Sequence, residues 1–162
     1  TGHVVSETGE LRLDAPGKTL ALRSPMTEAL AFDRIDADVD LGFATLKSAD
    51  GRGLFAISSL DGLPLAQSKR MLLILASDAH NTDMKFRDTD ERIIDDFGRL
   101  PVMIRKMDIG IRFDAENAFR ISPVGLDGRV YEPLVTASGR DAVMLTNAAP
   151  SGPTTYFLMD RD

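Results

Sequence analysis

The chain of 162 residues has no cysteine, no tryptophan and only two histidines, His3 and His80. Without cysteine it has no disulfides, no thiolate metal site and no cysteine nucleophile. Two histidines are too few for a histidine-based metal site, and no Gly-x-Ser-x-Gly motif accompanies them to indicate a serine hydrolase. Nothing singles out a carboxylate pair for glycoside cleavage among the 25 acidic residues. The sequence therefore predicts a protein that is not itself an enzyme.

Long apolar runs and an excess of positive charge are also missing. No run approaches the roughly 20 apolar residues that span a bilayer. The formal net charge of −6 argues against a nucleic-acid binder, which normally carries a basic patch. We therefore expect neither nucleic acid nor membrane as a partner. The chain begins with Thr and shows no signal peptide, so we expect a processed product or an excised domain.

What the sequence does contain is a series of short apolar segments separated by turn residues. Thr19 to Arg23 and Met107 to Phe113 alternate apolar and polar side chains, which is typical of strands. Turns are indicated at two Asp-Gly pairs, Asp61-Gly62 and Asp127-Gly128. The pattern predicts a single all-β domain over residues 1–162, an antiparallel β-sandwich with a jelly-roll-like arrangement, in which residues 1–5 are a linker or a first strand.

The densest apolar run, Met71 to Ala76, has no polar residue on either face. A run of this length fits a strand that is covered on both sides. Helix is a serious alternative, because Leu, Met, Ala, Lys, Arg and Gln favour helices and Pro64 suits a first helical position. The short distance between turn signals favours the strand.

One helix is predicted, at residues 89–97. Asp88 can cap its first turn, and Glu91 can return the bond as a capping box. Ile93, Ile94 and Phe97 would then share one face, and Gly98 suits a left-handed helix end.

Acidic and apolar residues alternate over residues 33–40. This pattern has two interpretations: an exposed edge strand or loop with Ile35 and Val39 facing inward, or a calcium site, because calcium needs several carboxylates at short spacing. The spacing does not match an EF-hand loop. The candidate ligands of a structural calcium ion are Asp33, Asp36, Asp38 and Asp40.

A polar loop follows the apolar run, and loops on rigid sandwiches often carry binding groups. The alternative is that its Asn and Asp side chains satisfy backbone groups in turns, which we favour for Asn81. Sugar binding needs an aromatic face beside hydrogen-bonding groups, and Tyr131, after an Asp-Gly turn, is the best exposed aromatic. The candidate ligand-binding residues are His80, Asn81, Lys85, Phe86, Arg87 and Tyr131.

Several short motifs resemble those of the C-terminal β-sandwich domain that follows the (β/α)8 catalytic barrel in some bacterial glycoside hydrolases. They are Thr8-Gly9-Glu10-Leu11, Ser59-Leu60-Asp61-Gly62, Pro64, Ser68-Lys69-Arg70, Asn81-Thr82, Met84, Gly98 to Val102, Leu126 to Val130, and Tyr156-Phe157-Leu158. The resemblance covers most of the chain, with two departures. Leu13 stands where such domains often have Trp, and the segment Asp88 to Phe97 looks like an insertion.

The resemblance implies an accessory module of a secreted or periplasmic polysaccharide-degrading enzyme. A polysaccharide or oligosaccharide and the catalytic domain of the parent chain are then the expected partners. The alternative is a purely structural domain that packs against a catalytic barrel without binding glycan. A large exposed apolar patch would favour this second function, because it would mark a surface that another protein normally covers.

Overall fold

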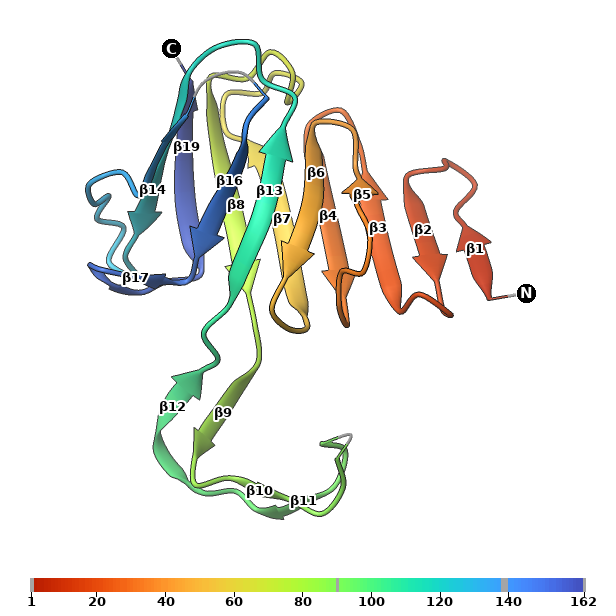
Figure 1. Cartoon of the computed structure of the whole chain (residues 1–162), viewed down its shortest axis with the longest axis vertical. Coiled ribbons are helices and arrows are strands. Elements are labelled where there is room, and N and C mark those ends of the chain that lie inside the picture. The colour runs from red at the N-terminus through yellow and green to blue at the C-terminus, as the bar shows by residue number, and fades with distance from the viewer. Residues whose placement is uncertain (1, 90, 138–139, 162) are drawn as a thin grey trace.

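The computed structural model describes residues 2–89, 91–137 and 140–161. Within these residues every regular element is a strand, and all pairings between strands are antiparallel (Figure 1). The predicted all-β antiparallel fold is therefore confirmed. The described residues form two larger sheets and three two-stranded pairs, two of which project from the rest of the molecule (Figure 1).

The larger sheet has nine strands, most of which follow one another as a meander. Between β4 and β7 the chain leaves for the second sheet and returns. In spatial order the strands are β1 (His3–Val5), β2 (Leu11–Asp14), β3 (Thr19–Arg23), β4 (Thr27–Phe32), β7 (Gly53–Ser59), β8 (Arg70–Ala76), β19 (Tyr156–Arg161), β14 (Phe119–Val124) and β15 (Val135–Ala137).

The second sheet has four strands and lies over one face of the first (Figure 1). Its order is β16 (Ala142–Thr146), β13 (Asp108–Phe113), β6 (Ala44–Ala49) and β5 (Val39–Asp40). The two-stranded pairs are β9 (Ala79–Thr82) with β12 (Arg99–Ile104), β10 (Lys85–Phe86) with β11 (Ile94–Asp96), and β17 (Ala148–Ala149) with β18 (Gly152–Pro153). At the N-terminal side, β1 and β2 extend beyond the smaller sheet (Figure 1).

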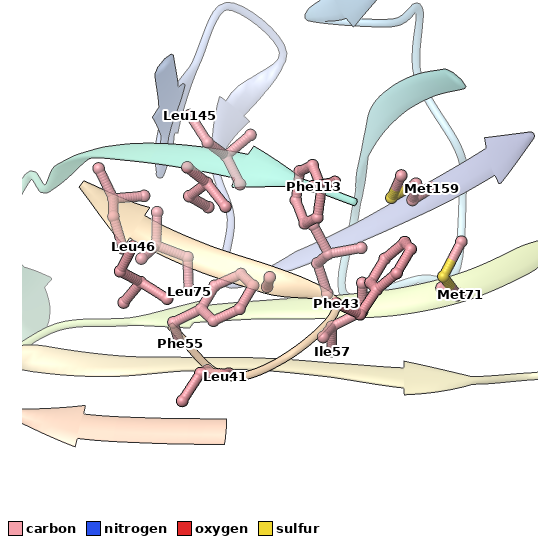
Figure 2. Close-up of a cluster of buried hydrophobic side chains, with 14 of the residues drawn as sticks. Leu41, Phe43, Leu46, Phe55, Ile57, Met71, Leu75, Phe113, Leu145 and Met159 are labelled. Atoms are coloured by element: carbon pink, nitrogen blue, oxygen red, sulfur yellow. The ribbon is translucent and has the colours of Figure 1, made fainter. Parts of the chain in front are cut away.

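The hydrophobic core lies between the two sheets (Figure 2). The larger sheet contributes Phe55 and Leu75 from adjacent strands, and the smaller sheet contributes Phe113 from above; all three are fully buried. The Phe113 ring lies 5.9 Å from the Phe43 ring and 5.4 Å from the Phe119 ring, the latter in an edge-to-face arrangement. Such aromatic contacts add to the hydrophobic contribution of burial, so this cluster fixes the two sheets to each other.

A buried carboxylate also links the two sheets. Glu28 on β4 is 4% exposed, and its Oε1 and Oε2 accept hydrogen bonds from the backbone N–H groups of Phe43 (2.7 Å) and Ala44 (2.9 Å). Burial raises the pKa of Glu28 from its ordinary value, although the two backbone hydrogen bonds and the positive charge of Arg23 act in the opposite direction. Gly42 allows this approach, because its φ is +119° and a Cβ there would lie 2.8 Å from Glu28 Oε1.

The run Met71 to Ala76 forms β8, so the strand prediction is confirmed and the helix alternative is wrong. Only one of its faces is covered, however. Met71, Leu73 and Leu75 are buried in the core, whereas the three residues that point the other way are half-buried. The expectation of a strand covered on both sides is therefore wrong for this chain on its own.

The predicted helix at residues 89–97 is also wrong. Asp88 does cap a turn, since its Oδ1 accepts from the N–H groups of Arg92 (2.8 Å) and Ile93 (3.1 Å). Glu91, however, has a left-handed φ of 57°, which ends any helical path. The following residues, Ile94–Asp96, form β11 and pair with β10. Asp90 lies outside the described residues. The capping residues stabilise a tight turn here, because no helix follows them.

Two smaller expectations concern the N-terminal edge of the larger sheet and the acidic segment at residues 33–40. Residues His3–Val5 form the edge strand β1, which agrees with the first-strand alternative for residues 1–5; Thr1 lies outside the described residues. Ile35 and Val39 pack against the core, as the edge-strand interpretation of the acidic segment predicts.

Candidate functional site

The most distinctive part of the molecule is a two-stranded arm, defined here as residues 79–104, that projects from one end of the sandwich (Figure 1). It consists of the β9–β12 and β10–β11 pairs. At its base the backbone N–H of Arg105 donates to the Asp78 carbonyl (2.8 Å), so the chain leaves and re-enters the sandwich at one point. A Cβ on Gly98, whose φ is +65°, would clash with the backbone around Asp83, so a glycine is needed where the two halves of the arm meet.

Apolar side chains are exposed along the arm. Leu100 is 78% exposed and Phe97 69%, and every residue of β12 is exposed. None of the described arm residues belongs to the core. A two-stranded ribbon without a core is marginally stable in water. The arm therefore presents an apolar surface that the described part of the chain does not cover.

Five of the six predicted ligand-binding residues lie on this arm, but they mostly bond to the arm itself. The ring of His80 lies 5.1 Å from that of Phe86, so these two aromatic groups are brought together. Asn81 Nδ2 donates to the Phe97 carbonyl (2.9 Å), which is the structural role favoured for it. Arg87 is paired with Asp95 (2.5 Å), and Lys85 lies opposite Asp96 in the β10–β11 pair.

Ion pairs attach the arm to the sandwich. Arg52, in the connection between β6 and β7, donates to both carboxylate oxygens of Asp78 (2.8 Å each) and to Glu91 near the tip of the arm. The hydrogen bond and the charge of Asp78 raise the pKa of Arg52. His80 Nε2 lies 3.7 Å from the same Glu91 carboxylate. The path of the arm is thus set by charged contacts at its base and tip rather than by buried apolar packing.

The sixth predicted residue, Tyr131, lies elsewhere, in the connection between β14 and β15. It lines two neighbouring hollows of about 310 and 360 Å³. The guanidinium carbon of Arg129 lies 5.2 Å from the centre of its ring, a cation–π distance. The structure therefore does not gather the six residues into one site; it separates Tyr131 from the residues of the arm.

The four predicted calcium ligands are each engaged separately. Asp33 pairs with Lys18 (3.0 Å), Asp36 with Arg34 (2.6 Å) and Asp38 with Lys47, while Asp40 Oδ1 accepts from the N–H of Gly42 (2.9 Å). Among the described residues, no three His, Cys, Asp or Glu side chains are grouped closely enough to hold a metal ion. Calcium binding by this segment stays a prediction from the sequence.

Two further features were not foreseen. One is a polar hollow of about 350 Å³ beside Arg161 and Arg140. Arg161 is fixed there by donating to the carbonyls of Leu65 (3.2 Å), Ala66 (3.0 Å) and Ser68 (2.7 Å), and burial lowers its pKa. Because its N–H groups are engaged with the backbone, this arginine serves the fold.

The second unforeseen feature is the arm itself, together with the uncovered face of the larger sheet. The turn and strand signals locate the strands of the larger sheet but not β9, β10 and β11 of the arm, where a polar loop and a helix were predicted, and they do not say which strands lack a covering layer. The one signal available was the absence of polar residues from both faces of the run Met71 to Ala76 in β8.

Comparisons with known protein families, curated proteins and solved structures find no match to this chain. The class that the structure defines is an all-β protein of antiparallel sheets with an apolar projecting arm. The described part of the chain contains no helix with the length and apolar character needed to cross a membrane.

Proposed function

We propose that this chain is a non-catalytic structural domain that docks on another protein through its arm. The observation that supports this is the exposure of apolar side chains on a segment that adds nothing to the core. Exposed apolar patches on a folded protein mark interaction surfaces, because covering them removes apolar area from water.

The chemistry of the arm indicates what its partner provides. The three arm arginines Arg87, Arg92 and Arg99 are already paired with Asp95, Asp88 and Asp83 of the arm itself (2.5, 3.5 and 2.9 Å). Recognition would therefore rest on the exposed apolar side chains of the arm, which are Ile93, Ile94, Phe97, Leu100, Val102, Met103 and Ile104. A protein with an apolar groove suits such an arm. If the resemblance to accessory domains holds, the catalytic barrel of a secreted or periplasmic bacterial glycoside hydrolase is the partner.

Photocrosslinking tests the docking proposal. Benzoylphenylalanine replaces Leu100 on the arm or, as the control, Leu126, a 95% exposed residue in the β14–β15 connection. The chain is produced and irradiated in cells of the organism that encodes it. We expect one defined protein adduct from position 100, identified by mass spectrometry, and none from position 126. Absence of an adduct at position 100, or the same adducts from both positions, would contradict the proposal.

Glycan binding is the second candidate function, and the observation in its favour is the position of Tyr131. An aromatic ring beside hollows of 310 and 360 Å³, with an arginine nearby, has the elements of a small sugar site. If this is the function, affinity electrophoresis in gels containing acidic or neutral polysaccharides will show retarded migration, and Tyr131→Ala will abolish it. Unretarded migration in every gel would exclude this candidate and leave the docking function.

A further inference from the structure

The outward face of the nine-stranded sheet, on the side opposite the core, is apolar across most of its width. Two rows of side chains cross neighbouring strands in register on this face. The first row is Val4, Leu13, Leu20, Ala31, Leu54 and Ala76. The second row is Leu11, Leu22, Ala29, Ala56, Ile74, Tyr156 and Val124. We call these two rows the outer face.

The outer face is not covered by the described part of the chain. Val4, Leu11, Leu13, Leu20, Leu54 and Tyr156 are between 37% and 60% exposed. An antiparallel sheet that meets water on one side normally alternates apolar residues inward with polar residues outward. The central strands β4, β7 and β8 instead carry Ala29 and Ala31, Leu54 and Ala56, and Ile74 and Ala76 on the outward side. Such strands have the composition of a sheet that is covered on both faces.

We propose that a second copy of this chain covers the outer face, giving a symmetric dimer in which the two nine-stranded sheets pack against each other. This inference goes beyond the proposed docking function, because it concerns a different surface. It rests on the lack of charge on the outer face, on the area of this face and on its shape.

Charge favours a second copy. The chain carries a formal charge of −6, so most ways of bringing two copies together place acidic surfaces against each other. The outer face has no charged side chain in either row. A hollow of about 580 Å³ over the first row is bordered by Lys18, Asp33, Arg52 and Asp78, which pair as Lys18–Asp33 (3.0 Å) and Arg52–Asp78 (2.8 Å). The outer face is therefore a neutral area on an acidic molecule.

Area is sufficient for a specific dimer. Seven strands, β2 to β14, carry the second row. At about 4.8 Å between strands and about 3.3 Å per residue over five residues, they make a face of about 550 Å². Two such faces would bury about 1,100 Å², just above the roughly 1,000 Å² that a specific interface needs and below the standard range. We therefore expect a reversible dimer rather than an inseparable one.

Shape favours packing of the face against itself. Ala29 and Ala31 on β4 make a low strip, which lies beside the leucines of β3, Leu20 and Leu22. In a dimer with a two-fold axis, each contact occurs twice, so the leucines of one copy can enter the alanine strip of the other, and the reverse. Two sheets packed face to face lie about 10 Å apart with interdigitated side chains, which this alternation of large and small residues permits.

Analytical ultracentrifugation of the purified chain from about 2 to 200 µM tests the dimer. We expect concentration-dependent conversion of monomer to dimer. The double variant Leu20→Lys, Leu54→Lys should raise the dissociation constant at least tenfold, because it places like charges in the interface. Met144→Lys, at a 61% exposed position on β16 of the smaller sheet, is the matched control and should leave the dissociation constant unchanged. Near-ultraviolet circular dichroism checks that each variant folds. If the double variant does not fold, Leu20→Ser is measured in its place.

A chain that stays monomeric over the whole concentration range would overturn the inference, as would a dimer that the outer-face variants leave intact. Neither result affects the arm, whose docking is measured separately by crosslinking at position 100. Conversely, the absence of a crosslinked adduct from position 100 would not change the result of the dimer measurement.

Discussion

Replacing Phe113 by alanine is expected to lower the free energy of unfolding by about 3 to 5 kcal/mol. Its ring is fully buried between the two sheets and contacts the rings of Phe43 and Phe119. Truncation would remove apolar contacts from both sheets at once and leave a cavity that rigid strands cannot easily fill. Equilibrium unfolding in urea or guanidinium chloride, followed by circular dichroism, gives the measurement.

The matched control is Phe97→Ala on the arm. Because Phe97 is 69% exposed and outside the core, its loss should change the free energy of unfolding by no more than about 0.5 kcal/mol. If the two substitutions proved equally destabilising, the division of the molecule into a packed sandwich and an unpacked arm would be wrong.

The second large effect is expected at Glu28. Glu28→Ala should lower the free energy of unfolding by about 2 to 4 kcal/mol, because it leaves the buried N–H groups of Phe43 and Ala44 without an acceptor. Phe43 directly precedes β6 of the smaller sheet and Ala44 is its first residue. The lost hydrogen bonds therefore lie where the two sheets are joined.

The effect of Glu28 should also depend on pH. Its pKa is higher in the folded than in the unfolded chain, so protonation favours the folded state. The stabilisation that Glu28 provides is therefore greatest below its unfolded pKa of about 4.5 and decreases as the pH rises through the raised folded value. Unfolding of both proteins between pH 4 and 8 measures this: the gap between wild type and Glu28→Ala should narrow with increasing pH. A gap that widens would show that the hydrogen bonds outweigh burial.

The sequence allowed most of the sandwich to be predicted, because strand alternation and turn residues are local signals. Met107 to Phe113 alternates clearly and contains β13, and the Asp-Gly turn at Asp61-Gly62 lies between β7 and β8. The error at residues 89–97 arose because a cap and a turn share the same short-range chemistry. Asp88 forms the predicted hydrogen bonds, and only the backbone of Glu91 decides that no helix follows.

The candidate site was harder to predict because its defining property is non-local. His80 and Phe86 were predicted as ligand-binding residues of one polar segment, which stays a prediction; the structure adds that their rings are in contact. That this segment leaves the sandwich, and that apolar residues such as Leu100 are exposed on it, depends on the absence of a covering layer. No residue pattern within the segment encodes that absence.

The closed base of the arm has a consequence for the length of the arm. Since Asp78 and Arg105 are hydrogen-bonded to each other, the chain ends flanking the arm already sit at the spacing of a short hairpin. Changes in the length of the chain between them therefore need not disturb the strands of the two sheets.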